Sequence, residues 1–395
     1  MSWITATLTL PSPDCCAVPG EGTYMQKALL KLGIWLLTAW LIVSRLGWAN
    51  TIGPQLSWEK ISQGKETLPV IEAPLSGLEE RLFADAADGR LNEFSLFEAA
   101  LIASGVDNRA AIGRYQERVA GWAKELRQSG CLDCAPQQQI EAIFEYLHRK
   151  ILYHGYDIQC TDLRQAMDEG RFNCVSSSVL FNCMASELGF TCCGLETPGH
   201  AMSRVFLQDG PLDLETTCPR WLQLKHDPVK QAEAVEKTIG NKAVQDKTKL
   251  REVTPIKLAA MIYYNRGVQF LAEKRFSEAV AANAKAFRLD PLNNTAWGNF
   301  LAAINNWAIE LGNTGQFAQA VALLKSGMVY DPHYEAFAIN FVHVHHQWSE
   351  HLCKENRYQE AAELLNRAAK EMPDQEYFKR ALWEVYGRWA VGSRQ

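Results

Sequence analysis

A cysteine, a histidine and a carboxylate in the middle of this 395-residue chain could together attack an amide bond. Cys174 lies in RFNCVSSS, at the head of a helix-like run, where the dipole and free N–H groups of a helix favour the thiolate. A cysteine nucleophile also needs a base, and His200 in TPGHAMSRV is the candidate. The pattern therefore predicts nucleophilic catalysis by Cys174, with His200 as its base.

A third residue must orient the imidazole, and two acids follow His200 on the next strand-like run. Placing the turn of a hairpin at Asp209–Gly210 makes Arg204 face Glu215 and puts both Asp213 and Glu215 on the face of His200. Glu215 is then one rung nearer to the imidazole, by roughly 7 Å at about 3.4 Å per residue. We therefore predict Glu215 as the orienting acid, with Asp213 as the alternative.

Each of these residues also has a purely structural interpretation. Free cysteine is among the most buried residue types, so Cys174 could be a packed thiol. His200 alone would more often be structural, and Glu215 could pair with Arg204 across the hairpin. The prediction of catalysis therefore depends on the three residues occurring together and in this order.

Two further clusters invite a metal or redox interpretation that we do not favour. Cys131 and Cys134 form a C-x-x-C pair, but no second Cys/His pair stands at zinc-finger spacing, so a local disulfide or two ordinary thiols is predicted. His343 and His346 share a helix face, which is interpreted as the polar wall of a groove. No glycine-rich phosphate loop is present, and neither a cofactor nor a metal is predicted.

The elements around the candidate residues predict an α+β domain. Three amphipathic helical patterns precede Cys174, the first with Ser95 as its N-cap. Asn173 can cap the helix that begins near Cys174, and Gly189 can end it. Two strand-like runs, HAMSRVFL and PLDLETT, then flank the turn signal QDG. Helices therefore come first and a small antiparallel sheet follows.

The last part of the chain repeats at an interval of 41 residues. The recurring positions are Phe276, Phe317 and Tyr358; Ala279, Ala320 and Ala361; Ala286, Gly327 and Ala368; and Pro291, Pro332 and Pro373. Small residues at a helix crossing and a proline after the second helix resemble tetratricopeptide repeats, whose usual period is about 34 residues. The additional residues in each repeat of 41 equal about two helical turns. We predict three helix pairs with elongated first helices, and a capping helix over Phe378–Trp389.

The order NCVSSSVLFNCMASELGF, GHAMSRVFL, LDLETT resembles the transglutaminase-like superfamily over about residues 80–220. The resemblance implies a papain-like core and thiolate attack on an amide carbonyl, with the acyl group released to water or to an amine. It also implies an oxyanion hole made by the Cys174 N–H and a second donor, Tyr156 or Asn173. The family acid is usually Asp in D-x-T, whereas ETT places Glu215 in that slot.

With its repeats, the chain resembles bacterial proteins that join a transglutaminase-like domain to a tetratricopeptide tail. We predict a cysteine hydrolase or acyltransferase acting on peptide or isopeptide amides, whose repeat groove recruits a peptide or protein substrate or a protein partner. The alternative is a catalytically silent scaffold, because some domains of this superfamily have lost catalysis. A net charge of −5 without a basic block gives nucleic-acid binding no support.

The N-terminal segment has the layout of a signal peptide. Lys27 and Lys31 precede an uncharged run, and small residues stand before a cleavage position after Ala49. Met25 would be a better start than Met1 for such a signal, and a retained membrane anchor through residues 29–48 is the alternative. The prediction is an exported (periplasmic or extracytoplasmic) or membrane-anchored protein rather than a cytoplasmic one, and export would permit disulfides.

These observations predict the following organisation along the chain. It comprises a signal peptide or membrane segment over 1–50, a linker over 51–79, a transglutaminase-like domain over 80–224, a charged connector over 225–252, and tetratricopeptide-like repeats over 253–395.

Overall fold

The computed structural model describes residues 73, 75–131, 133–197, 199–239 and 250–392. The predicted signal or membrane segment over 1–50, the two candidate start residues and most of the predicted linker lie outside these ranges. All elements below belong to one contact unit that includes Leu68–Gln395. None of the helices in the described ranges is long and apolar enough to cross a membrane.

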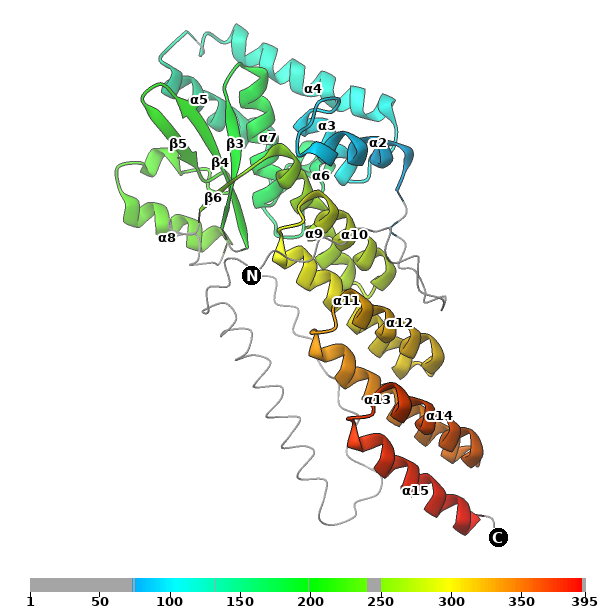
Figure 1. Ribbon diagram of the computed structural model, residues 1–395. Helices are drawn as coiled ribbons and strands as arrows, with labels where there is room; N and C mark the ends of the chain where they lie inside the picture. The colour runs from blue at the N-terminus through cyan, green and yellow to red at the C-terminus, as the bar shows by residue number, and fades with distance from the viewer. Residues whose placement is uncertain (1–72, 74, 132, 198, 240–249, 393–395) are drawn as a thin grey trace. The chain divides into compact units, whose positions relative to one another are not determined.

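Helices make up the first part of the described chain (Figure 1). They are α2 (Gly77–Asp85), the short η2 (Ala86–Asp88), α3 (Leu96–Ala103), α4 (Arg109–Gln128), α5 (Pro136–Tyr146), the π-helical turn η3 (Leu147–Ile151) and α6 (Leu163–Glu169). Ser95 caps α3, as predicted, by accepting a hydrogen bond from the Glu98 N–H. Helix α2 begins at Gly77, within the stretch predicted as linker, because Ser76 and Glu79 form a capping box there.

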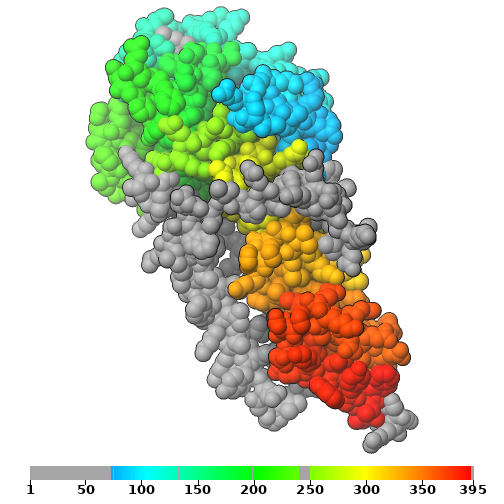
Figure 2. All heavy atoms as spheres, viewed as in Figure 1, coloured from blue at the N-terminus to red at the C-terminus, as the bar shows by residue number. Residues whose placement is uncertain are grey.

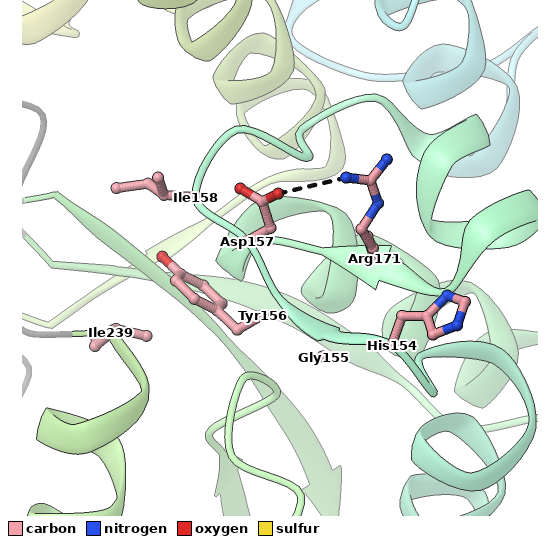
Figure 3. A pocket seen from close by; sticks show the side chains of 7 residues that line it. All are labelled: His154, Gly155, Tyr156, Asp157, Ile158, Arg171 and Ile239. Atoms are coloured by element: carbon pink, nitrogen blue, oxygen red, sulfur yellow. Dashed lines mark ion pairs between the residues drawn. The ribbon is translucent and has the colours of Figure 1, made fainter.

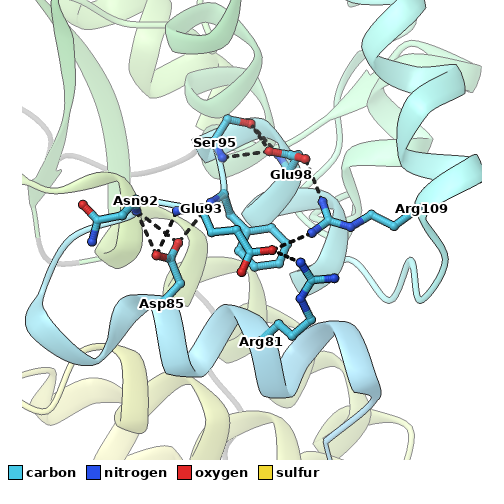
Figure 4. A network of polar contacts seen from close by, with 8 residues as sticks. Arg81, Asp85, Asn92, Glu93, Ser95, Glu98 and Arg109 are labelled. Atoms are coloured by element: carbon cyan, nitrogen blue, oxygen red, sulfur yellow. Dashed lines mark hydrogen bonds and ion pairs between the residues drawn. The ribbon is translucent and has the colours of Figure 1, made fainter.

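A polar network fixes the loop between α2 and α3 (Figure 4). The Asp85 carboxylate accepts hydrogen bonds of 2.9–3.0 Å from the backbone N–H groups of Asn92, Glu93 and Phe94. Arg109, at the start of α4, bridges Glu93 and Glu98, each at 3.0 Å. The network ties the ends of three helices together without using any residue of the candidate site.

The central helix is α7 (Cys174–Glu187), which is buried on almost every side. It contacts α3, α4, α5, α6 and strands of the sheet, so an apolar or small residue is needed all round it. The Asn173 side-chain oxygen accepts hydrogen bonds of 3.0 Å from the Val175 and Ser176 N–H groups. Gly189 follows the helix with a φ of 93°, which glycine adopts without strain. Both predicted ends of this helix are confirmed.

An antiparallel sheet in the order β5-β4-β3-β6 packs beside α7 (Figure 1). Its strands are β3 (Cys192–Thr197), β4 (His200–Leu207), β5 (Gly210–Leu214) and β6 (Arg251–Val253), and a separate parallel pair consists of β1 (Gly155–Tyr156) and β2 (Arg171–Phe172). Ala201, Ser203 and Val205 of β4 are buried on the α7 side, where the Ser203 hydroxyl donates to the Ser178 carbonyl at 3.4 Å. The α+β class is confirmed.

The stretch predicted as a charged connector contributes to this sheet. It contains helix α8 (Pro228–Ile239) and strand β6, which pairs with β3 in antiparallel register. Arg251 of β6 forms an ion pair with Glu196 of β3, with the Nε and Oε2 atoms 2.6 Å apart. A three-residue strand of this charged composition carries no alternating apolar pattern, so this strand was not predicted.

Seven helices follow in the C-terminal part. They are α9 (Pro255–Ala272), α10 (Phe276–Leu289), α11 (Asn294–Asn313), α12 (Phe317–Tyr330), α13 (Glu335–Lys354), α14 (Tyr358–Glu371) and α15 (Glu376–Gly392). The 41-residue interval recurs in the starts of α10, α12 and α14, and in a left-handed turn residue before each: Lys274, Gly315 and Asn356. The first helices of the pairs have 18 or 20 residues and the second helices 14, as the interval predicted.

Helix α9 belongs to the core of the preceding domain as well as to the first helix pair. Leu258 and Ile262 are fully buried in the same hydrophobic cluster as residues of α3 and α7. Glu79 of α2 accepts a hydrogen bond of 2.9 Å from the Tyr263 hydroxyl and pairs with Lys285 of α10 at 2.8 Å. In Figure 2 the blue α2–α3 segment accordingly lies against the yellow-green α9–α10 segment. The helix pairs are therefore packed onto the α+β domain through α9.

Gly327 in α12 provides a test of the packing between successive helix pairs. A Cβ at this position would lie 2.5 Å from the ring of Phe337 in α13, which is completely buried. We expect Gly327→Ala to lower the free energy of unfolding by about 1–3 kcal/mol through overpacking. Gly298→Ala in α11 is the matched control, because its Cβ meets nothing within 4 Å and alanine favours a helix by about 0.5–1 kcal/mol. Urea unfolding of both variants measures the difference. Equal midpoints for the two variants would contradict the close packing of α12 against α13.

Candidate active site

Cys174 is the first residue of α7 and is 9% exposed. Its backbone N–H has no partner within the helix, because the first N–H groups of a helix are never satisfied internally. The side chain of Asn173 caps the helix with its oxygen, while its amide nitrogen donates to the Ile158 carbonyl at 3.3 Å and to Thr161. Asn173 is therefore fully engaged in holding the first turn, which leaves the Cys174 N–H as the free donor beside the thiol.

His200 and Glu215 form a buried hydrogen-bonded pair. The His200 Nε2 and Glu215 Oε2 atoms are 2.7 Å apart, and the two side chains are 1% and 0% exposed. The other carboxylate oxygen, Oε1, accepts hydrogen bonds from the Thr217 N–H at 3.0 Å and from its hydroxyl at 2.6 Å. Because both carboxylate oxygens are bound, the carboxylate has one orientation. Thr217, the second threonine of ETT, fixes this orientation.

The second neighbour of the His200 ring is Cys174. Since Nε2 is taken by Glu215, Nδ1 is the nitrogen left to interact with the thiol, which contributes to the pKa of His200. Burial alone would lower the pKa of His200, but the Glu215 carboxylate and then Cys174 raise it to about 10. These two neighbours therefore favour the protonated imidazole, which is the form that would stabilise a thiolate.

The strand register differs from the predicted one by two residues. Leu207 pairs with Gly210, so the turn lies at Gln208–Asp209 and not at the Asp-Gly signal. Arg204 consequently opposes Asp213, not Glu215, and the two are joined by hydrogen bonds of 2.6 and 2.9 Å. The predicted pairing of Arg204 with Glu215 was wrong, and the alternative acid Asp213 lies on this ion pair, away from His200.

Two tyrosine side chains lie in the electrostatic environment of Cys174. Burial and then the charge of Cys174 raise the pKa of Tyr156, on β1, well above its usual value. The same two causes raise the pKa of Tyr264, on α9. Tyr156 was predicted from the sequence as a candidate donor, but Tyr264 was not. It lies about ninety residues after the cysteine, and α9 carries no local motif that marks the site. The first helix pair thus contributes a residue to the surroundings of the thiol.

His148 is a further buried histidine near the site that the sequence did not single out. It lies in the π-helical turn η3, and its ring packs against those of Phe144 and Phe172 at centroid distances of 4.7 and 5.9 Å. Neither ring nitrogen is accessible, and neither has a hydrogen-bond partner among the described residues. Burial lowers the pKa of His148 to about 4, against a smaller opposing effect of Glu215.

Replacement of His148 is expected to change how the free energy of unfolding depends on pH. Its folded pKa lies below the unfolded value, so the unfolded chain binds the proton first and stability falls as the pH drops from about 6.5 to 4. His148→Phe should remove on the order of 2 kcal/mol of this loss of stability at low pH. At neutral pH the substitution should change the free energy of unfolding little, because it removes two buried nitrogens that have no hydrogen-bond partner among the described residues. Urea unfolding across this range measures the effect, with His226→Phe on the surface as the control. An identical acid dependence in wild type and His148→Phe would refute it.

The other predicted cysteine and histidine clusters form no metal site in the described part of the chain. Cys131 and Cys134 are both free thiols, as are the other cysteines described there. The His346 Nδ1 atom and the Tyr377 hydroxyl are hydrogen-bonded to each other at 2.7 Å. The described residues contain no cluster of three or more His, Cys, Asp or Glu side chains that could hold a metal ion.

A cavity of about 520 Å³ opens beside Tyr156 (Figure 3). Its lining consists of His154, Gly155, Tyr156, Asp157, Ile158, Arg171 and Ile239. The parallel pairing of β1 with β2 places Tyr156 next to Phe172, two residues before Cys174. The cavity therefore lies beside the strand pair that leads into α7, although Cys174, His200 and Glu215 are not among its lining residues.

A cysteine at the start of the buried helix α7, a histidine at the start of β4 and an acid directly after β5 form an arrangement that agrees with a papain-like fold. Residues 113–261 match the family model described as Transglutaminase-like superfamily, so this part of the chain is a transglutaminase-like domain. The match ends at Met261 within α9 and leaves the later helix pairs uncovered. Comparison with curated proteins and with solved structures finds no match.

Proposed function

We propose that the protein is a cysteine hydrolase or acyltransferase that acts on peptide or isopeptide amides. The observation that carries the proposal is the buried His200–Glu215 pair, 2.7 Å long, whose second neighbour is Cys174. The Cys174 thiolate would attack the amide carbonyl and form a thioester. His200 would give its proton to the leaving amine, whose bond to the carbonyl carbon breaks. Water or a second amine would then release the acyl group.

Stabilisation of the tetrahedral intermediate is assigned to two donors. The Cys174 N–H is free at the first position of the helix, and the Tyr156 hydroxyl forms no hydrogen bond with any other described residue. Asn173, the other donor considered from the sequence, is occupied by its capping and side-chain bonds. A backbone N–H and a tyrosine hydroxyl on either side of the carbonyl oxygen would form the oxyanion hole.

The C-terminal helix pairs are proposed to be tetratricopeptide-type repeats that recruit the substrate or a protein partner. The support is the 41-residue recurrence of helix starts and turn residues, and the succession of contacts from α9 to α11, α13 and α15. Such a succession creates an extended surface of stacked helices. The proposal that the protein is exported or membrane-anchored rests on the layout of residues 25–50 alone.

The experiment that tests this function uses a casein digest in water enriched in oxygen-18, with and without a fluorescent primary amine. Hydrolysis would place the heavy oxygen in new carboxylates, and transfer would attach the fluorescent amine to the peptides. We expect one of these products with the wild-type chain and none with Cys174→Ala. Identical products from both proteins would refute the enzymatic proposal and favour the silent scaffold.

A further inference from the structure

The cavity beside Tyr156 has an apolar part and a charged part (Figure 3). Figure 3 shows the Tyr156 ring, Ile158 and Ile239 together on one side, and the Asp157 side chain turned toward Arg171. The Ile158 side chain is 47% exposed, although isoleucine gains stability from burial. This part of the cavity therefore offers an exposed apolar surface to a hydrophobic group.

The charged part is lined by Asp157 and Arg171, and an ion pair to a residue outside the cavity decides which of the two charges is more available to a ligand. Arg171 is bound by Glu169, through its Nε atom at 3.1 Å and through a second guanidinium nitrogen. Its remaining nitrogen, Nη1, is 3.8 Å from Asp157, beyond hydrogen-bond distance. Of the lining residues, Asp157 and Arg171 therefore carry one charge of each sign, and Arg171 is held more closely by Glu169, which does not line the cavity, than by Asp157. The Asp157 carboxylate accepts a hydrogen bond of 3.0 Å from the Gln159 N–H and has the Arg171 guanidinium 3.8 Å away, so it is the less closely paired of the two charges.

From this arrangement we propose that the cavity is a specificity subsite for a lysine-like side chain of the substrate, next to the amide that Cys174 attacks. The aliphatic arm lies on Tyr156, Ile158 and Ile239, and the terminal ammonium pairs with Asp157. The inference rests on the proposed function, because it assigns the cavity to the same substrate. A carboxylate side chain fits poorly, since Arg171 is already paired with Glu169 and Asp157 would repel it.

The test measures alkylation of Cys174 in the full chain by chloroacetamides that carry different arms. The thiolate forms a bond to the carbon and chloride leaves, so no turnover is required. The probes are aminoalkyl chloroacetamides of graded arm length, the matching alkyl chloroacetamides and the carboxyalkyl analogues. Intact mass spectrometry with peptide mapping gives the rate at Cys174. The best aminoalkyl probe should react about three- to tenfold faster than its alkyl counterpart, which corresponds to one partly exposed ion pair.

Three variants locate the effect. Asp157→Asn should abolish the preference for the amine, and Arg171→Gln should increase it by removing the competing cation. Asp168→Asn is the matched control, because this acid pairs with Arg118 and does not line the cavity. Equal rates for amine and alkyl arms at a reactive Cys174, or faster labelling by the carboxylate, would overturn the subsite but leave the proposed function standing. No labelling of Cys174 by any probe would overturn both.

Discussion

Replacement of Cys174 with alanine is expected to lower kcat/KM on a cleavable amide by about 10⁵–10⁶-fold. The reason is that every covalent step passes through the thiolate, and loss of a nucleophile removes nearly all that the catalytic group contributes. The residual rate would come from substrate binding and the oxyanion donors alone. The measurement is the initial rate on the peptide that gives the strongest Cys174-dependent product in the casein assay.

Cys160→Ser is the matched control for this variant. Cys160 is a second buried thiol close to the same helix start, where its carbonyl accepts a hydrogen bond from the Asn173 N–H at 3.2 Å. Burial raises the pKa of Cys160 to about 11, with Asp157 adding to the effect, so it is a poor nucleophile. Cys160→Ser should keep the wild-type rate within about tenfold. A larger loss in Cys160→Ser than in Cys174→Ala would show that the wrong thiol has been assigned.

Replacement of Glu215 with glutamine has the second largest expected effect, a fall in kcat of about 10²–10⁴-fold with little change in KM. Glutamine keeps the shape and can still accept from Thr217, but it no longer stabilises the protonated imidazole or fixes its tautomer. Because the carboxylate holds the pKa of His200 high, the pH profile should also move to lower pH in this variant. Steady-state kinetics over a range of pH values measures both changes.

Asp213→Asn distinguishes this prediction from the alternative acid. Asp213 pairs with Arg204 at 2.6 Å and lies at a partly exposed position, with 31% of its side chain accessible. Its replacement removes an ion pair near the surface, which we expect to change kcat by less than about threefold and stability by less than about 1 kcal/mol. A fall in kcat for Asp213→Asn that matches Glu215→Gln would contradict the assignment of the orienting acid.

Local signals in the sequence correctly predicted that Cys174 lies at the start of a helix. An asparagine before Cys174 and a glycine after the apolar run carry cap information within a few residues, and both are used as caps. The 41-residue recurrence worked for the same reason, because each repeat gives independent evidence for the same helix starts. Predictions of this kind need no knowledge of which distant segments meet.

The choice of Glu215 did not follow from a correct register. The Asp-Gly signal placed the turn one residue too late, which displaced every opposing pair by two positions. A shift of two leaves each paired side chain on the same face, so the argument still favoured an odd-numbered acid, although Glu215 itself lies just beyond the paired residues. The pairing of β4 with β5 ends at Ser203 and Leu214, so Glu215 reaches His200 from the segment that directly follows β5. The error in register did not change the choice of Glu215 as the orienting acid. It did change the predicted partner of Arg204.

Long-range packing accounts for what the sequence did not predict. Strand β6 has only three residues and pairs with β3 across more than fifty positions of the chain. Tyr264 lies near Cys174 because α9 packs on α7, and His148 lies near Glu215 because of a π-helical turn. None of these placements leaves a periodic or motif signal near the residue concerned.

The central claim is that His200 activates Cys174, and the rate of alkylation of Cys174 by iodoacetamide at neutral pH tests it most directly. Peptide mapping by mass spectrometry separates Cys174 from the other cysteines. We predict that Cys174 in the folded chain reacts at least about tenfold faster than the exposed thiol of Cys131, and that His200→Ala removes the difference. Slow labelling of Cys174 that His200→Ala leaves unchanged would contradict the account.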